Sequence, residues 1–385
     1  INNCKLVVSE ENKMTYDGTT YTLADNLDPT LFSTFDQDSG TRTIEYPLKY
    51  PVGGKTTVTV DYNYEGGYDV AKLTSLILDT VEEDSTSVPD YFMYNCAVLN
   101  EVILPKSWNV ITIGNGFLTS CSGLQNCEMP STWVNVTEIG HVFLNGRTSL
   151  SSVNFPETWK LNSMGGGFMS YCRALTSLKL PEGGELEMIN GAFLESCDNL
   201  KSIVFPSSWK VNKIENFFLA YCRSLTSCDF PSTWKVASIG QEFMNDCESM
   251  TSINLPSSWP VTEIDRGFLL SCKNVKSITL PSTWQITKIS REFMCSCEQL
   301  TSITLPSNWQ ITSVETYFLL NCINLQSVNM GSVTANVMEV GQGTDDTTFA
   351  VQDRDCPAYN NGIKIYGDDK VNIQKKFDSR DTYPY

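Results

Sequence analysis

The segment LTSITLPSNWQITSVETYFLLNC, residues 300–322, is one copy of a motif that recurs along most of the chain. Its opening L-x-x-I-x-L alternates in its second half. This predicts a short β-strand with Ile303 and Leu305 facing a core and Ser302 and Thr304 facing solvent. The proline that follows has no N–H to donate and therefore ends the strand. Each copy thus begins with a strand that is apolar on one side only.

The rest of each copy returns the chain to the start of the next strand. A second apolar pair, such as Val261 and Ile264, is expected to point inward on this return path. The Phe-Leu or Phe-Met step before the cysteine predicts one short turn of α- or 3₁₀-helix. The initial strand is predicted at residues 73–78, 99–104, 124–129, 150–155, 175–180, 200–205, 225–230, 250–255, 275–280, 300–305 and 325–330.

Three residue types recur with the motif every 25 or 26 residues and form columns, with Gly184 in the one tryptophan vacancy and Arg147 in the cysteine gap. The members are Trp108, Trp133, Trp159, Trp209, Trp234, Trp259, Trp284 and Trp309; Cys96, Cys121, Cys172, Cys197, Cys222, Cys247, Cys272, Cys297 and Cys322; and Phe92, Phe117, Phe143, Phe168, Phe193, Phe218, Phe243, Phe268, Phe293 and Phe318. Such a period is typical of solenoids, in which one unit cannot bury its apolar edge alone and successive coils stack about 4.8 Å apart.

The order F-x-x-x-C-x-x-[LV]-x-S-I-x-L-P-S-x-W, as from Phe268 to Trp284, resembles the BspA-like leucine-rich repeats. The resemblance covers about residues 72–330 and implies a right-handed, β-rich leucine-rich-repeat solenoid with one parallel strand per repeat. It also implies a surface-exposed or secreted protein, of bacteria or some protists, that adheres to host or microbial ligands. The repeat departs from the common unit in its greater length and in the tryptophan after the proline.

The two terminal segments lack the repeat, which predicts that each forms a cap on one end of the solenoid. Residues 1–71 are expected to form a small β-rich domain with strands at 5–10, 42–50 and 56–64, which would cover the open edge of the first repeat. Residues 72–330 form the solenoid, with about 11 strands and 10 full repeats. Residues 331–385 are expected to close its other end, because 356–377 resembles the closing segment of the same family.

Composition excludes several kinds of partner. The chain has 27 Lys and Arg against 44 Asp and Glu, a formal charge of −17, whereas nucleic-acid binding needs clustered cations. The acidic balance also disfavours adsorption to anionic membranes, and no apolar run reaches the roughly 18 residues of a membrane span. The first residue is Ile1, which suggests a processed or partial chain.

The cysteines and tryptophans each have two interpretations. Stacked cysteines lie close enough for disulfides, but reduced, buried thiols that meet a loop carbonyl are favoured, and a line of thiols does not suit zinc. Outside the column, Cys127 and Cys228 are expected in the core and Cys295 at the surface, whereas the redox states of Cys4, Cys295 and Cys356 stay open. The tryptophans form either a buried spine, which is favoured, or an exposed binding stripe.

Residues for catalysis or cofactor binding are scarce. His141 is the only histidine and is expected in a loop, and the Gly165–Gly167 run is expected to form a turn. Two acidic pairs, Asp345-Asp346 and Asp368-Asp369, lack the spacing of a calcium loop and predict a solvated surface. We therefore expect no metal, no cofactor and no enzyme activity.

The outward strand positions are the predicted binding surface. They are small, polar and almost uncharged, so affinity would come from many repeated hydrogen bonds. The residues chosen are Thr176, Lys201, Thr226, Thr251, Lys276 and Thr301. We expect an extracellular or cell-surface adhesion or recognition protein that binds a protein or glycan on a host or neighbouring cell. The alternative is a self-associating structural subunit or decoration of a surface layer, appendage or virion.

Overall fold

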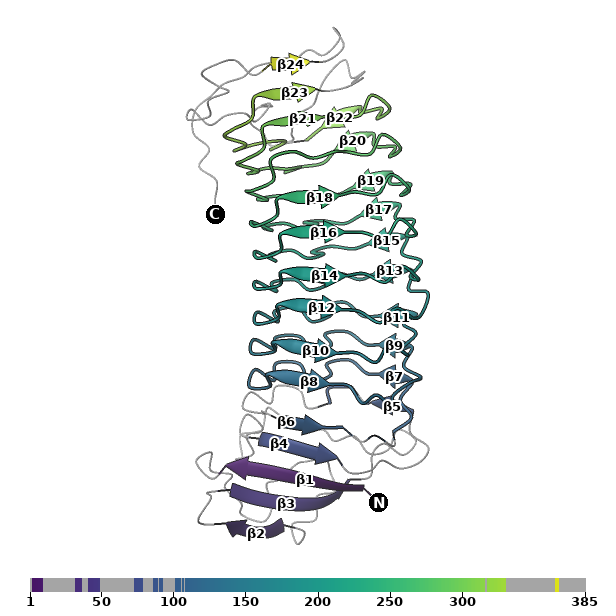
Figure 1. Cartoon of the computed structure of the whole chain (residues 1–385), viewed down its shortest axis with the longest axis vertical. Helices are drawn as coiled ribbons and strands as arrows, with labels where there is room; N and C mark the ends of the chain where they lie inside the picture. The colour runs from purple at the N-terminus through teal and green to yellow at the C-terminus, as the bar shows by residue number, and fades with distance from the viewer. Residues whose placement is uncertain are drawn as a thin grey trace. The chain divides into compact units, whose positions relative to one another are not determined.

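The structure is a computed structural model of the 385-residue chain. It describes the strands at 2–9, 32–36, 41–48, 73–78 and 364–366, together with residues 86–88, 90–92, 101–104, 106, 108–315 and 317–329. The chain divides into two compact units, Ile1–Lys210 and Val211–Tyr385. In both units the predicted repeats are parallel coils of a β-solenoid (Figure 1).

The first unit contains a sheet at its beginning and two columns of short parallel strands after it. The first sheet has the order β2-β3-β1-β4-β6, and later β5, β7, β9 and β11 form one column while β8 pairs with β10 and β12 with β14. The bounds are β1 Asn2–Ser9, β2 Phe32–Asp36, β3 Thr41–Leu48, β4 Leu73–Leu78, β5 Ser87–Val88, β6 Glu101–Ile103, β7 Thr112–Ile113, β8 Asn126–Glu128, β9 Glu138–Ile139, β10 Ser152–Asn154, β11 Ser163–Met164, β12 Ser177–Lys179, β13 Met188–Ile189 and β14 Ser202–Val204.

The second unit has the same two-column arrangement. On one side β16 pairs with β18, β21 with β23 and β23 with β24, and on the other β15, β17 and β19 are neighbours and β20 pairs with β22. The bounds are β15 Lys213–Ile214, β16 Ser227–Asp229, β17 Ser238–Ile239, β18 Ser252–Asn254, β19 Glu263–Ile264, β20 Lys288–Ile289, β21 Ser302–Thr304, β22 Ser313–Val314, β23 Ser327–Asn329 and β24 Lys364–Tyr366.

The predicted strands exist but are shorter than expected. In the repeats from β6 onward the six-residue ranges contain three-residue strands, and 275–280 contains none. Successive coils are in register, since Cys228 lies opposite Ile253 and Ile303 opposite Val328. Ile303 is 2 % exposed, whereas Ser302 and Thr304 are exposed, as the alternation predicts.

The core consists of the same side chain repeated in each coil. The phenylalanine rings stack face to face, for example Phe117 on Phe143 at 5.3 Å and Phe243 on Phe268 at 5.5 Å between ring centroids. Offset stacking of this kind is favourable beyond the apolar area it buries. Val261 and Ile264 are buried, as predicted for the return path.

The expected helical turn before each cysteine is wrong. No residue that the structure describes lies in a helix, and the segment from one residue before each column phenylalanine to three after it, here called the turn ribbon, has another conformation. Alternate residues have a positive φ, as at Gly267 (72°), Leu269 (54°) and Ser271 (57°). A helix needs negative φ at every residue, so the alternation excludes one.

Hydrogen bonds between coils explain this unusual backbone. The N–H groups of Gly267 and Ser271 donate to Arg291 and Cys295 of the following coil at 2.9 and 2.7 Å, and that of Leu269 donates to Phe243 of the preceding coil at 3.0 Å. A left-handed conformation costs a non-glycine residue about 1 kcal/mol or more. Bonds to both neighbouring coils satisfy buried polar groups that a local helix would have paired within itself.

Close approach between coils requires glycine at two points. A Cβ at Gly165 would lie 2.4 Å from the backbone nitrogen of His141, and one at Gly184, where φ is +94°, would lie 2.1 Å from the carbonyl oxygen of Leu161. The glycine run is therefore a tight contact between coils. The tryptophan vacancy at Gly184 is likewise a place where the backbone leaves no room for a side chain.

The terminal predictions are only partly covered by the described residues. Strands β1 and β3 agree with the predicted strands at 5–10 and 42–50, and β1 pairs antiparallel with β4, the first strand of the repeats. The predicted strand at 56–64 lies outside the described residues. So does the proposed C-terminal cap, apart from β24, which pairs parallel with β23.

Replacing one ring of the phenylalanine column should leave a cavity that neighbouring coils cannot fill. We expect Phe268→Ala to lower the free energy of unfolding by about 3–5 kcal/mol in urea titrations. Ser252→Ala, on the exposed side of β18, should change it by less than about 0.5 kcal/mol. Equal effects of the two substitutions would contradict a core built from this column.

Candidate interaction surfaces

The predicted binding residues lie on the side of the strands that faces solvent, here called the strand face. Thr176, Lys201, Thr226, Thr251, Lys276 and Thr301 are all exposed, each one residue before the serine of its repeat. Two of the hydroxyls also hold adjacent coils together, because Thr251 and Thr301 donate to the carbonyls of Thr226 and Lys276 at 3.4 and 3.3 Å. The strand face therefore combines exposed polar groups with a rigid spacing.

The serines that follow continue this polar surface. Ser177 lies opposite Ser202 in the first unit, and Ser227 lies opposite Ser252 in the second. Because parallel strands are about 4.8 Å apart, a ligand that lies along the stack contacts the same hydroxyl at each coil. Each hydroxyl can both donate and accept a hydrogen bond.

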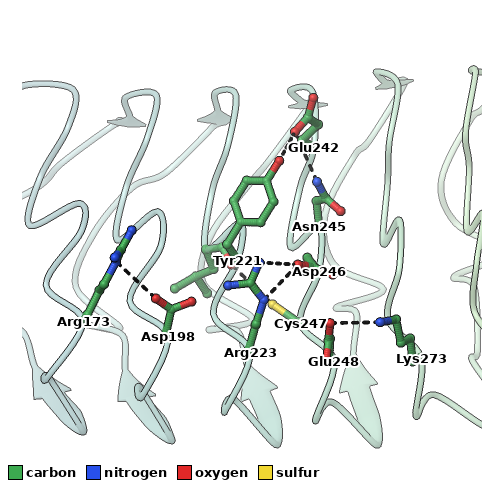
Figure 2. A network of polar contacts seen from close by, with 11 residues as sticks. Arg173, Asp198, Tyr221, Arg223, Glu242, Asn245, Asp246, Cys247, Glu248 and Lys273 are labelled. Atoms are coloured by element: carbon green, nitrogen blue, oxygen red, sulfur yellow. Dashed lines mark hydrogen bonds and ion pairs between the residues drawn. The ribbon is translucent and has the colours of Figure 1, made fainter. Parts of the chain in front are cut away.

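A second surface, on the turn-ribbon side, carries the larger charged and aromatic side chains (Figure 2). In the second unit the guanidinium of Arg223 donates to Asp246 through two nitrogens, at 3.0 and 2.8 Å. The carboxylate of Glu242 accepts from Tyr221, Asn245 and Arg266 at 3.4, 3.2 and 3.1 Å. These residues belong to successive coils, so the network ties neighbouring coils together.

The residue after each column cysteine from Cys172 to Cys297 alternates in charge, and this set is here called the charge column. Lys273 pairs with Glu248 at 3.0 Å in the second unit, and Arg173 pairs with Asp198 at 3.4 Å in the first. The hydrogen bond that Lys273 donates to Glu248 raises the pKa of Lys273. The charge column consists of Arg173, Asp198, Arg223, Glu248, Lys273 and Glu298.

Arginine and tyrosine dominate many protein interfaces, yet on this surface they are engaged within the chain. Arg223 pairs with Asp246, Arg266 with Glu242, and the guanidinium of Arg291 lies 4.9 Å from the ring centroid of Tyr317. The sequence analysis missed this network, although the alternating charges after the cysteines were a readable signal. The turn-ribbon side thus contributes to the stability of the stack, which leaves the strand face as the better candidate for recognition.

The column cysteines are reduced and buried. All eleven cysteines that the structure describes are free thiols, and the Sγ of Cys272 donates to the carbonyl of Met244 at 3.2 Å. Cys172, Cys197, Cys247, Cys297 and Cys322 make the same contact, each with the residue after the preceding column phenylalanine. The thiols therefore complete the turn ribbon by satisfying its inner carbonyls. Burial raises the pKa of Cys172 and of Cys272 from 9.0 to about 12.

The cysteines outside the column differ in part from expectation. Cys127 and Cys228 are buried, as predicted, but Cys295 is also fully buried, so the expectation that it lies at the surface is wrong. Cys295 faces inward because it lies between Met294 and Ser296, the two left-handed residues of this part of the turn ribbon. The side chains of Cys4, Cys96 and Cys356 lie outside the described residues.

Arg147 replaces a cysteine of the column and brings a charge into the core. Its side chain is fully buried, and its Nη2 donates to the carbonyl of Leu124 at 3.0 Å. Its Nε and Nη1 have no hydrogen-bond partner among the described residues. Unpaired buried charge is destabilising, so this coil is a local weak point of the core.

The tryptophans lie in the core and not on a binding stripe. None is more than 2 % exposed, and Trp284 stacks on Trp309 with ring centroids 6.4 Å apart and planes 2° apart. The indole N–H of Trp284 donates to the carbonyl of Pro256 at 3.2 Å, and that of Trp309 to Pro281 at 3.1 Å. Burial with a satisfied N–H is what the spine interpretation requires.

No group of three or more His, Cys, Asp or Glu side chains that could hold a metal ion is found in the part of the chain that the structure describes. His141 is exposed, and its Nδ1 accepts a hydrogen bond from the backbone N–H of Gly166 at 3.0 Å. The acidic pairs Asp345-Asp346 and Asp368-Asp369 lie outside the described residues. Among the described residues there is also no helix long and apolar enough to span a membrane.

Comparison with known proteins adds a family assignment. The family model of the BspA type leucine rich repeat region matches residues 86–223 and 212–342, with six copies. A leucine-rich repeat protein of Bacteroides ovatus is 19 % identical over 67 % of this chain and 73 % of its own, with a TM-score of 0.44. A leucine rich cell surface protein of Faecalibacterium prausnitzii is 17 % identical over 75 % of this chain and 90 % of its own, with a TM-score of 0.36. No curated protein matches.

Burial should make the described thiols unreactive in the folded protein. At pH 8 we expect iodoacetamide to leave Cys272 and the ten other described cysteines unlabelled until guanidinium unfolds the chain, as read by peptide mass spectrometry. The exposed control Ser302→Cys should label within minutes. Rapid labelling of Cys272 in the native protein would show that the column is accessible.

Charge reversal in the network should weaken the stack. We expect Arg223→Glu, which faces Asp246, to lower the free energy of unfolding by about 1 kcal/mol at low salt, less in 1 M NaCl, and the added change Asp246→Arg to restore part of it. Lys160→Glu, an exposed control, should have little effect. An unchanged midpoint for Arg223→Glu would mean that the pair contributes nothing to stability.

Proposed function

The chain belongs to the BspA-type leucine-rich-repeat family, and from this we propose that it is an extracellular or cell-surface recognition protein. It binds a protein or glycan on a host or neighbouring cell through the strand face of its repeats. Surface exposure is typical of the family that the repeat resembles. The role is adhesion or recognition, without catalysis.

One observation carries this proposal: the strand face repeats the same exposed polar groups at a fixed spacing. Thr226 and Ser227 of one coil are followed by Thr251 and Ser252 of the next, and the backbone N–H of Thr251 donates to the carbonyl of Thr226 at 3.1 Å. Contacts that are weak singly add up when a ligand meets several coils at once. A surface of this kind suits an extended ligand or one displayed in many copies.

Charge supports the choice of ligand class. The formal charge of −17 opposes binding to nucleic acid and to strongly anionic surfaces. The described strand face carries charges of both signs that are spread along the stack, and Lys179 pairs with Glu157, beyond the end of β10, at 2.7 Å. Neutral glycans and protein surfaces are the partners that such a face tolerates.

The test is direct binding of the intact chain to arrays of glycans and extracellular-matrix proteins. A strand-face variant carries Thr176→Ala, Lys201→Ala, Thr226→Ala, Thr251→Ala, Lys276→Ala and Thr301→Ala. A matched control carries Lys160→Ala, Lys210→Ala, Lys235→Ala, Gln285→Ala, Thr287→Ala and Gln310→Ala, all exposed residues of the return path. We expect the first variant to lose at least tenfold in affinity and the second to keep it.

Two outcomes would overturn the proposal. Equal loss by both variants, with unchanged thermal unfolding, would remove the strand face from recognition. Failure of the intact chain to bind any ligand on the arrays or on intact cells, together with ordered self-assembly in solution, would favour a structural subunit instead.

A further inference from the structure

The strand face of the second unit is interrupted at one coil. Residues 277–279 occupy the position of a strand but form none, although β18 precedes and β21 follows them at the equivalent position. Ile253 and Ile278, which face inward on the two adjoining coils, are partly exposed, whereas their equivalents Cys228 and Ile303 are buried. The apolar layer beneath the hydroxyls is therefore open to solvent here.

An open groove of about 510 Å³ lies at this interruption. It extends over β16, β18 and the segment that ends at Pro281, so it covers three successive coils of the same unit. Apolar parts of Ile253, Leu255 and Phe230 contribute to its lining, with Leu255 and Phe230 each 6 % exposed. Its volume falls within the range of sites that bind small molecules.

The polar lining is rich in hydroxyl and amide groups. Ser227, Ser252, Asn254 and Thr279 line the groove, and all four are exposed. Each can donate and accept hydrogen bonds. The lining includes one carboxylate, that of Asp229, and no lysine or arginine. A ligand with phosphate, sulfate or carboxylate groups would find no countercharge here and would be repelled by Asp229.

These features define a ligand with many hydroxyl groups, an apolar C–H face and no negative charge, which is the chemistry of a neutral sugar. The spacing of the repeats also suits a chain of sugar units. Coils recur about every 4.8 Å, so a chain of sugar units that lies along the stack meets equivalent hydroxyl groups as it passes from coil to coil. A protein loop would find none of the deep pockets for aromatic or arginine anchors that tight protein interfaces use.

We propose that the groove over β16, β18 and residues 279–281 binds a neutral oligosaccharide or polysaccharide. This rests on the proposed function and specifies its ligand class and its position. Hydroxyl and amide side chains on the rim hold the sugar hydroxyls, and the partly exposed Ile253 contacts its C–H groups. Affinity at a single groove is low, and display of many copies on a surface strengthens attachment.

The experiment measures binding of the intact chain to defined sugars by isothermal titration calorimetry. The probes are the neutral hexasaccharides cellohexaose, chitohexaose, maltohexaose and mannohexaose, with heparin and hyaluronan as anionic controls. Ser252→Trp places an indole in the groove, whereas Lys160→Trp places it at an exposed residue of the return path, outside the strand face and the groove. Asn254→Ala removes an amide without filling the space.

We expect at least one neutral hexasaccharide to bind and neither polyanion to bind. Ser252→Trp should weaken binding at least tenfold and Asn254→Ala about threefold, while Lys160→Trp stays within twofold of the parent chain. Thermal unfolding of each variant shows whether it is folded. If Ser252→Trp does not fold, sugar binding by Asn254→Ala tests the groove in its place. Equal binding by the parent chain, Ser252→Trp and Asn254→Ala would overturn the proposal.

The outcomes separate this inference from the proposed function. Binding of a matrix protein on the arrays, with no neutral sugar bound, would overturn the glycan groove and leave a recognition role intact. Binding of the polyanions alone would overturn the choice of ligand class. Absence of binding to every sugar, protein and cell would overturn both.

Discussion

Within each unit, main-chain hydrogen bonds between successive coils are the constraint on which the structure depends. They occur in the two columns of short strands and again in the turn ribbon, where Leu269 donates to Phe243 of the coil before it. Because these bonds join backbone to backbone at a fixed spacing, inward residues of neighbouring coils lie directly over one another. Uniform columns of phenylalanine, tryptophan and cysteine follow from this geometry, since identical side chains stack without gaps.

The same constraint explains which predictions succeeded. Period and alternation are properties of inward and outward positions, so the strands, the buried tryptophans and the reduced cysteines could be predicted from residues such as Ile303, Trp284 and Cys272. The sign of φ cannot be predicted from the residue types where hydrogen bonds to neighbouring coils impose it. Leu269 and Ser271 are left-handed although neither favours that conformation, and the helical turn and the exposed Cys295 were wrong for this reason. The glycine at 267 was the only local signal within that ribbon.

The candidate site was less predictable than the fold. Outward residues are not constrained by packing. The sequence therefore predicts the strand face, but it does not show whether this face or the turn-ribbon side is the better candidate for binding. Only the structure shows that Arg223 pairs with Asp246 and Arg266 with Glu242, so the larger side chains of the turn-ribbon side are engaged in contacts within the chain. The interruption at 277–279 is also invisible in the sequence, because Ser277, Ile278 and Thr279 conform to the motif. The groove borders this segment through Thr279 and Pro281.

The charge column has a consequence for how the gene can change. Its members alternate from Arg173 through Asp198 and onward to Glu298, so neighbouring repeats are complementary and are not interchangeable. Duplication or deletion of one repeat would place two like charges at neighbouring positions of the column, and salt would screen their repulsion because the side chains are partly exposed. A change of two repeats at a time keeps the alternation. A pair of repeats is therefore the smallest unit that can be added or removed here without setting like charges side by side.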